Sequence, residues 1–143
     1  MKSYSFRLQK LLEMREKKEE QSKLEFKKAE NEKRFEEEKL FKLKDNYSKY
    51  SNINLNDSVI EKKIRHNYLR SLNYCINETS ENLDKKVDIV EKKREELKKC
   101  QIEKKTVEIL KEKDKLAFEK EQKMIEQKLN DELALYAYMR NQN

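Results

Sequence analysis

Hydrophobic residues recur along this chain at alternating steps of three and four, which marks one apolar stripe on an α-helix. The clearer stripe runs from Leu72 to Gln101, and a poorer one runs from Leu8 to Tyr50. Between them the sequence reads YSNINLNDS, and its Asn and Ser side chains compete with helical hydrogen bonding. The pattern predicts a first helix at about residues 5–50, a loop at about 51–57 and a second helix at about 58–139.

Two local signals bear on the second helix. Ser58 and Glu61 have the spacing of a capping box, in which each side chain accepts a hydrogen bond from the other residue's backbone amide. The sequence NETSEN at residues 77–82 is a weaker interruption, where this helix could break. The expected first stripe is Leu8, Leu12, Arg15, Glu19, Ser22, Phe26, Ala29, Lys33, Glu36, Leu40, Leu43, Tyr47 and Tyr50. The expected second stripe is Leu72, Ile76, Thr79, Leu83, Val87, Val90, Arg94, Leu97 and Gln101.

Folding the chain at residues 54–55 brings strong apolar positions of the two stripes opposite each other. Facing residues in an antiparallel pair have numbers with a constant sum, here about 109, so Phe26 is expected opposite Leu83 and Leu12 opposite Leu97. The sequence therefore predicts an all-α fold, with two long helices in an antiparallel coiled-coil hairpin forming a single domain of residues 1–143. A parallel homodimer is the alternative, but it gives no reason for pairing to centre on this point.

The second helix is too long for the first. At about 1.5 Å per residue it would extend roughly 120 Å, against roughly 70 Å for the first helix. Beyond residue 104 its apolar residues continue, and the chain approaches its end with LALYAYM at residues 133–139. An apolar stripe without an intramolecular partner indicates an intermolecular one. We therefore expect an overhanging C-terminal helix that binds another molecule.

Composition supports long helices. The chain has no Gly and no Pro, and 45% of its residues are charged, which is typical of coiled coils and unfavourable for tight turns. Acidic and basic residues are interleaved, and the net charge of +6 is modest. Disorder is the alternative, but it is favoured by high net charge without apolar periodicity. Basic doublets such as Lys27-Lys28 are flanked by Glu, so we expect no nucleic-acid partner.

Candidate chemistry is sparse. The sole histidine is His66, and no Gly-rich loop is present to cradle a phosphate. Cys75 and Cys100 lie roughly 37 Å apart along one helix, so they cannot form a disulfide within the chain. We expect no enzyme, cofactor, metal site or small-molecule substrate. No apolar run approaches the ~20 residues of a membrane span, and MKSYSFRLQK lacks the apolar core of a signal peptide, so we expect a cytosolic protein.

Two stretches resemble the flagellar export protein family FliJ. The opening FRLQKLLEMREKKEEQSKLEF, residues 6–26, is similar to the N-terminus of that family. KREELKKCQIEKKTVEILKEKDKLAFEKEQKMIEQKLNDELA, residues 93–134, resembles its long C-terminal helix, including the ending Asp131-Glu132-x-Ala134. The resemblance covers essentially the whole chain.

This resemblance implies a non-enzymatic component of the flagellar type III protein export apparatus, which serves flagellum biogenesis, motility and chemotaxis. Members of the family resemble the central stalk of rotary ATPases. They are taken to enter the ring of the export ATPase, to contact the membrane export gate and to escort export chaperones. It also implies a cytoplasmic protein, peripheral at the inner face of the cell membrane and held there through its partners.

The resemblance and the overhang together suggest two sets of contact residues. For the ATPase ring we expect Leu8, Leu12, Leu116, Phe118, Met124, Ile125, Leu129, Leu133 and Tyr136. For the export gate we expect Leu72, Ile76, Thr79 and Leu83, although packing against the first helix is the alternative role of these four. A generic cytosolic coiled-coil scaffold and the equivalent stalk of a virulence type III secretion system are the alternative functions.

Overall fold

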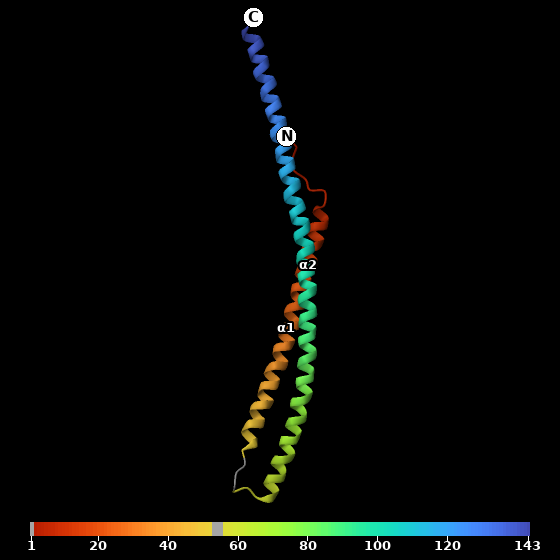
Figure 1. The fold of residues 1–143 in the computed structure, drawn as a ribbon, viewed down its shortest axis with the longest axis vertical. Coiled ribbons are helices and arrows are strands. Elements are labelled where there is room, and N and C mark those ends of the chain that lie inside the picture. Colours follow the sequence, from red (N-terminus) through yellow and green to blue (C-terminus); the bar gives the residue numbers. More distant parts are fainter. Residues whose placement is uncertain (1, 53–55) are drawn as a thin grey trace. The chain divides into compact units, whose positions relative to one another are not determined.

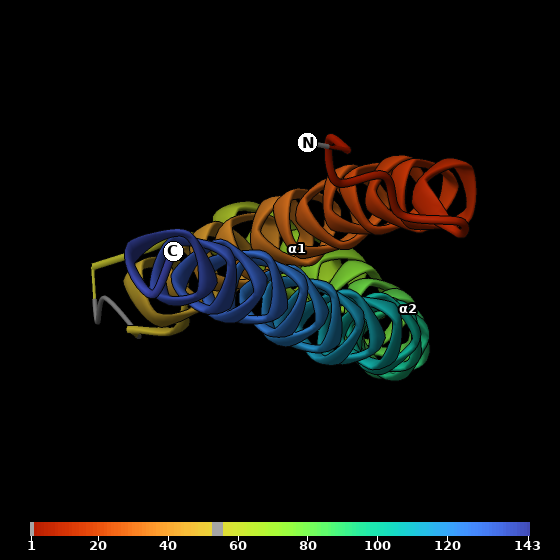
Figure 2. The same ribbon diagram turned by 90° about the horizontal axis from the view of Figure 1, so that it is seen from above.

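The computed structural model describes residues 2–52 and 56–143. Within these residues there are two helices and no strand: α1 spans Gln9–Ser51 and α2 spans Val59–Asn141. The helices pack against each other and run in opposite directions (Figure 1), and a view turned by 90° again shows them side by side (Figure 2). The predicted all-α helical hairpin is confirmed. The predicted fold point at residues 54–55 lies outside the described residues.

Both helices are long because little in the sequence interrupts them. The Ser58 amide donates to Glu61 Oε2 at 3.1 Å and the Glu61 amide donates to Ser58 Oγ at 3.2 Å, so the capping box at the start of α2 is confirmed. The helix then continues through residues 77–82 without a break. Thr79 in this stretch is only 2% exposed, so its packing outweighs the weak local preference for a turn.

The contacts divide the chain into two compact units, which share the two helices. One unit is Glu20–Lys99, and the other comprises Met1–Glu19 and Cys100–Asn143. We call them the central unit and the terminal unit.

In the central unit, the buried residues of the two helices form one polar-lined seam. Ser22 and Ala29 are buried on α1, and Leu72, Thr79 and Val90 are buried on α2. Two of these five residues carry hydroxyl groups. The seam therefore offers less apolar area than a Leu-rich coiled coil, and burial of such area is what stabilises helix pairing.

Cross-helix contacts of the central unit show that the predicted register is wrong. Lys86 Nζ lies 3.1 Å from Glu32 Oε2, and Lys93 Nζ lies 3.2 Å from Glu25 Oε2. The residue numbers of each pair add to about 118 rather than 109. The offset of nine residues displaces α2 by roughly 13 Å along its axis, so the predicted pairing of Phe26 with Leu83 is also wrong.

The position of the two tyrosines near the loop explains this offset. Tyr50 stacks edge-on against Tyr68, with ring centroids 5.1 Å apart, although α2 begins at Val59. The first turns of α2 therefore lie beyond the end of α1. In the second turn of α2, the Arg65 guanidinium donates to the Asn52 carbonyl and pairs with the Asp57 carboxylate. Counting from the middle of the loop wrongly assumes that the two helix ends face each other.

The terminal unit has a similar seam and the same register. Leu12 and Glu19 are buried on α1, and Cys100 and Val107 are buried on α2. Arg15 Nη1 donates to the Glu103 carbonyl at 2.7 Å. This contact shows that the predicted pairing of Leu12 with Leu97 is wrong, because the facing part of α2 lies about nine residues later.

The predicted stripe on the first helix is confirmed from Leu12 to Leu43, where each member is at least half-buried. On α2 the stripe is confirmed from Leu72 to Val90, but Arg94 and Gln101 are exposed. Lys93 and Cys100 occupy the seam in their place, and Lys86 lies in it beside Val87, because the seam keeps alternating steps of three and four residues from Leu83 onward. Arg94 instead lies over the Phe26 ring, at 5.8 Å from its centroid.

Candidate functional site: the C-terminal part of α2

Residues 2–8 of the terminal unit are not helical, although a helix was expected from about residue 5. Their aromatic side chains instead pack on α2. The Tyr4 ring lies 5.4 Å from the Phe118 ring, and the Tyr4 hydroxyl donates to Asp114 Oδ2 at 3.0 Å. Lys111 Nζ donates to Gln9 Oε1 at 2.8 Å and lies 6.0 Å from the centre of the Phe6 ring. We call residues 2–8 the N-terminal strap.

The environment of Tyr4 alters its ionisation. Its pKa is raised above the ordinary value of 10.0, first by desolvation and then by the hydrogen bond and the charge of Asp114. Both effects favour the neutral phenol, because an ionised Tyr4 would lose its proton donor and face a carboxylate. The strap is therefore held in its bound position by a neutral tyrosine.

Beyond Phe118, α2 has no helix packed against it among the described residues. Every residue from Lys123 to Asn143 is exposed. Residues 11 apart in sequence lie on one face of a straight α-helix, so Phe118 and Leu129 share a face, as do Ile125 and Tyr136. We define the uncovered stripe as the apolar residues of this face beyond the strap: Ile125, Leu129, Leu133 and Tyr136.

The predicted ring-contact residues fall into three groups. Leu12 is 4% exposed and packs in the seam, so it supports the helix pair rather than presenting a surface. Phe118 is half-buried under Tyr4, and Leu8 is 39% exposed at the start of α1. The remaining six are exposed: Leu116, Met124, Ile125, Leu129, Leu133 and Tyr136. Of these six, Leu116 and Met124 lie off the uncovered stripe, since the helical rotation of 100° per residue turns them away from it.

The last turns of α2 carry exposed apolar residues outside the uncovered stripe as well. Leu135, Tyr138 and Met139 are exposed, and at 100° per residue these three, the alanines at 134 and 137 and the two last stripe residues together surround the axis. A helix that is apolar on all sides is normally buried on all sides. The chemistry of this end therefore fits enclosure by another molecule.

The predicted gate-contact residues lie in the seam of the central unit. Leu72 and Thr79 are buried, and Ile76 and Leu83 are half-buried. All four contribute to the packing of α2, which was the alternative role considered for them. Exposed neighbours such as Tyr74, which is 70% exposed, form the adjoining surface.

A buried ion pair interrupts the seam of the terminal unit. Glu19 is 5% exposed, and Lys104 Nζ lies 2.9 Å from Glu19 Oε2. The hydrogen bond to Glu19 is the main cause that raises the pKa of Lys104, while desolvation acts against it. Lys104 is therefore a cation at neutral pH, and its pairing with Glu19 joins α1 to α2 within the terminal unit.

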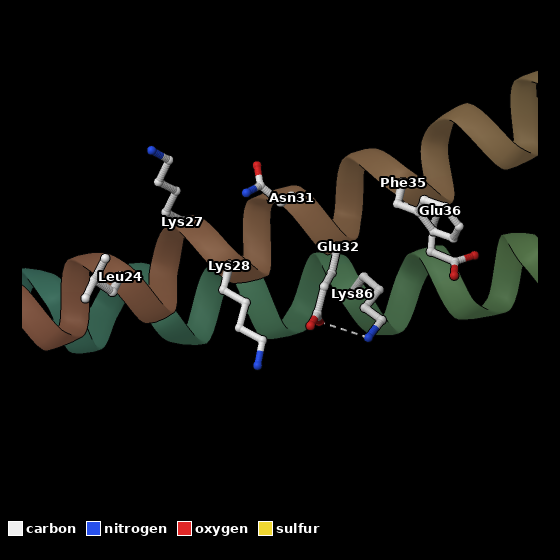
Figure 3. A pocket seen from close by; sticks show the side chains of 8 residues that line it. All are labelled: Leu24, Lys27, Lys28, Asn31, Glu32, Phe35, Glu36 and Lys86. Atoms are coloured by element: carbon white, nitrogen blue, oxygen red, sulfur yellow. Dashed lines mark hydrogen bonds and ion pairs between the residues drawn. The ribbon is translucent and has the colours of Figure 1, made fainter.

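The central unit also has an open groove of about 570 Å³, shown in Figure 3. Lys86 reaches across from α2 to Glu32 on α1, while Lys27 points away from α2 (Figure 3). Leu24 and Phe35 supply the apolar part of the lining.

Among residues 2–52 and 56–143, no cluster of three His, Cys, Asp or Glu side chains has the geometry to hold a metal ion. Neither helix contains, within those residues, a segment apolar enough to cross a membrane. Cys75 and Cys100 are both free thiols.

Sequence reasoning missed the strap. Tyr4 and Phe6 are two residues apart, which suits neither stripe; Phe6 falls within the expected first helix and Tyr4 just before it. The alternation of aromatic and polar residues in SYSFR is the available signal, because such alternation is typical of an extended segment lying on a surface.

Comparison with known proteins agrees with this geometry. Residues 4–143 match the family model of the flagellar FliJ protein. No curated protein and no solved structure gives a significant match. The family match covers the strap, both helices and the uncovered stripe. The chain therefore belongs to the FliJ family, whose members are non-catalytic components of the flagellar export apparatus.

Proposed function

We propose that this protein is the stalk of the flagellar export ATPase, with the C-terminal part of α2 held inside the ATPase ring. The observation that carries the proposal is the uncovered stripe of Ile125, Leu129, Leu133 and Tyr136, which continues a helix that is paired elsewhere in the terminal unit. Exposed apolar area of this kind is stabilised when a partner removes it from water, by about 25 cal/mol per Å².

The end of α2 favours a ring over a single partner helix. It is apolar on all sides, so a groove would leave part of it exposed to water. A cavity bounded by several subunits would cover it fully.

We further propose that the central unit faces the membrane export gate near Leu72, Ile76, Thr79 and Leu83. Because these residues pack in the seam, their role is to hold α2 in place, and the exposed side chains beside them, such as Tyr74, make the contact. Escort of export chaperones, a cytoplasmic location and peripheral attachment to the membrane complete the proposal. Support for these three comes from membership of the family.

The stalk proposal is tested by replacing Leu129 and Leu133 with Lys. Both side chains are exposed, so the variant should keep its helicity, while two charges within an apolar contact should abolish co-purification with the flagellar export ATPase. Stimulation of ATP hydrolysis should be lost together with binding. A control variant with Gln127→Lys and Asn130→Lys adds the same charge outside the stripe, and it should bind normally.

Two results would contradict the proposal. If the Leu129→Lys, Leu133→Lys variant binds and stimulates the ATPase like the unaltered chain, the stripe is not the contact. If both variants lose binding equally, added charge rather than loss of apolar contact is responsible. Circular dichroism at 222 nm checks that each variant keeps its helices.

A further inference from the structure

The net charge of the chain is concentrated at one end of the central unit. Between Glu38 and Glu78 there are eight Lys or Arg residues and three Asp or Glu residues, so this segment carries +5 of the total +6. The rest of the sequence is almost neutral, because its many charges balance. We call residues 39–77 the basic end; it contains the end of α1 and the start of α2 (Figure 1).

The acidic residues of the basic end are already engaged locally. Asp45 pairs with Lys49 at 3.2 Å, and Asp57 pairs with Arg65. Glu61 accepts the hydrogen bond of the Ser58 amide in the capping box. Within the described residues, six cations of the basic end form no ion pair: Lys39, Lys42, Lys44, Lys62, Lys63 and Arg70. All six are exposed.

The first turns of α2 are amphipathic in addition to being basic. Ile60 and Ile64 are 71% and 64% exposed and lie one turn apart on one side of the helix, while Tyr68, one turn further on, is engaged by Tyr50. Lys62 and Arg70 lie on another side, together with the neighbouring Lys63. A helix that combines a basic face and an unpartnered apolar face is typical of segments that lie in the interface of a membrane.

We propose that the basic end binds directly to the surface of a bilayer containing anionic phospholipid. The cations reach the headgroup phosphates, since long Lys and Arg side chains extend toward charge while their stems stay on apolar surface. Ile60 and Ile64 enter the boundary between headgroups and acyl chains. This inference goes beyond the stalk function and does not depend on an ATPase or an export gate.

The unpaired cations indicate that the partner is negatively charged. The apolar face beside them favours an anionic lipid surface over other negatively charged partners. A nucleic acid would use the same cations, but it would gain little from Ile60 and Ile64, because isoleucine offers neither a hydrogen bond nor a stacking ring to a base. Neither face alone would be sufficient for membrane binding at physiological ionic strength, where surface charges are screened within about 8 Å.

The test is cosedimentation of the purified full chain with vesicles. Vesicles of phosphatidylcholine alone should retain little protein, and vesicles with about 30% phosphatidylglycerol should retain much more. Raising the salt from about 0.05 M to about 0.5 M should release it. The variant Lys62→Glu, Lys63→Glu should lower the partition coefficient about tenfold or more, since each cation near an anionic surface contributes about fivefold.

Two further variants separate the alternatives. Lys98→Glu, Lys99→Glu makes the same change of net charge at another exposed doublet of the central unit, and it should bind vesicles almost normally. Ile60→Ser, Ile64→Ser keeps every charge and removes the apolar face, and it should reduce binding severalfold. Circular dichroism should show unaltered helicity in both, because all four side chains are exposed.

Any one of the following outcomes would overturn the proposal. Equal losses in the two Lys doublets would mean that only total charge matters. Equal binding to both kinds of vesicle, or to neither, would remove the electrostatic basis. Tighter binding to a 20-base-pair DNA duplex at the same salt, unaffected by Ile60→Ser, Ile64→Ser, would identify a nucleic-acid surface instead.

Discussion

Replacing Leu12 with Ala should detach the start of α1 from α2 in the terminal unit. Leu12 is 4% exposed in a seam that also buries Val107, which is 2% exposed. In a closed core such a substitution costs about 2–5 kcal/mol, which includes the cavity that remains. A seam between two helices is open to water along both sides, so its residues can close part of the cavity, and we expect a cost near the lower limit, about 2 kcal/mol.

This cost is large compared with the packing of the unit. The buried apolar residues of the terminal seam are Leu12, Cys100 and Val107, so one of three is removed. Hydrogen exchange should therefore become faster in the first turns of α1 and in the facing part of α2, by about thirtyfold for 2 kcal/mol. Exchange measured by mass spectrometry on the peptides covering residues 9–19 and 100–111 gives this value directly.

Leu24→Ala is the matched control, because Leu24 is 70% exposed in the neighbouring unit. It should change stability by less than about 0.5 kcal/mol. If Leu12→Ala leaves exchange unchanged, or if both substitutions accelerate it equally, Leu12 does not occupy a seam and the helix pairing described for this unit is incorrect.

Three further predictions concern register, ionisation and the buried ion pair. Spin labels at Glu25 and Lys93 should be closer than labels at Glu25 and Asp84, because the observed register and the one predicted from the sequence differ by roughly 13 Å along the axis. If pulsed electron resonance finds the Glu25–Asp84 distance shorter, the register predicted from the sequence is correct. Because the pKa of Tyr4 is raised in the folded state, its contribution to stability is complete below pH 10.0 and is lost as the pH rises through the raised value. The difference in the free energy of unfolding between the unaltered chain and Tyr4→Phe should shrink there; a decrease of this difference already at pH 8 would contradict the reasoning. Replacing both partners, Glu19→Leu with Lys104→Met, should raise the melting temperature, because exchanging a buried ion pair for apolar residues is often stabilising; a marked decrease in calorimetry would mean that the ion pair dominates the seam.

The fold class could be predicted because its signal is periodic and extends over many residues. A stripe from Leu12 to Leu43 can face a partner only if the chain is helical and paired, and every member proved at least half-buried. The same reasoning placed the start of α2 at the capping box of Ser58 and Glu61, where the hydrogen bonds confirm it. These features depend on residues that are close in sequence, so local physical chemistry determines them.

The candidate contact surfaces were only partly predictable. The exposed apolar face of α2 was expected because the first helix is too short to pair with all of the second. The burial of Leu12 and the packing of Tyr4 on Phe118 could not be expected in this way, because they depend on tertiary contacts. The basic end was missed for another reason. Its Lys doublet beside Glu61 resembles every other doublet, and only the local balance of charge between Glu38 and Glu78 distinguishes it.

The register itself follows from charge rather than from apolar matching. A sum of 109 would place Glu19 opposite Val90 and Arg15 opposite Arg94, which buries a carboxylate without a cation and brings two cations together. The observed register places Glu19 beside Lys104 at 2.9 Å and gives Arg15 a carbonyl acceptor on Glu103. Leaving a buried charge unpaired costs several kcal/mol, more than an apolar pair gains by better alignment. In a seam with so few large apolar residues, its charged members therefore select the register, as polar seam residues do in other coiled coils.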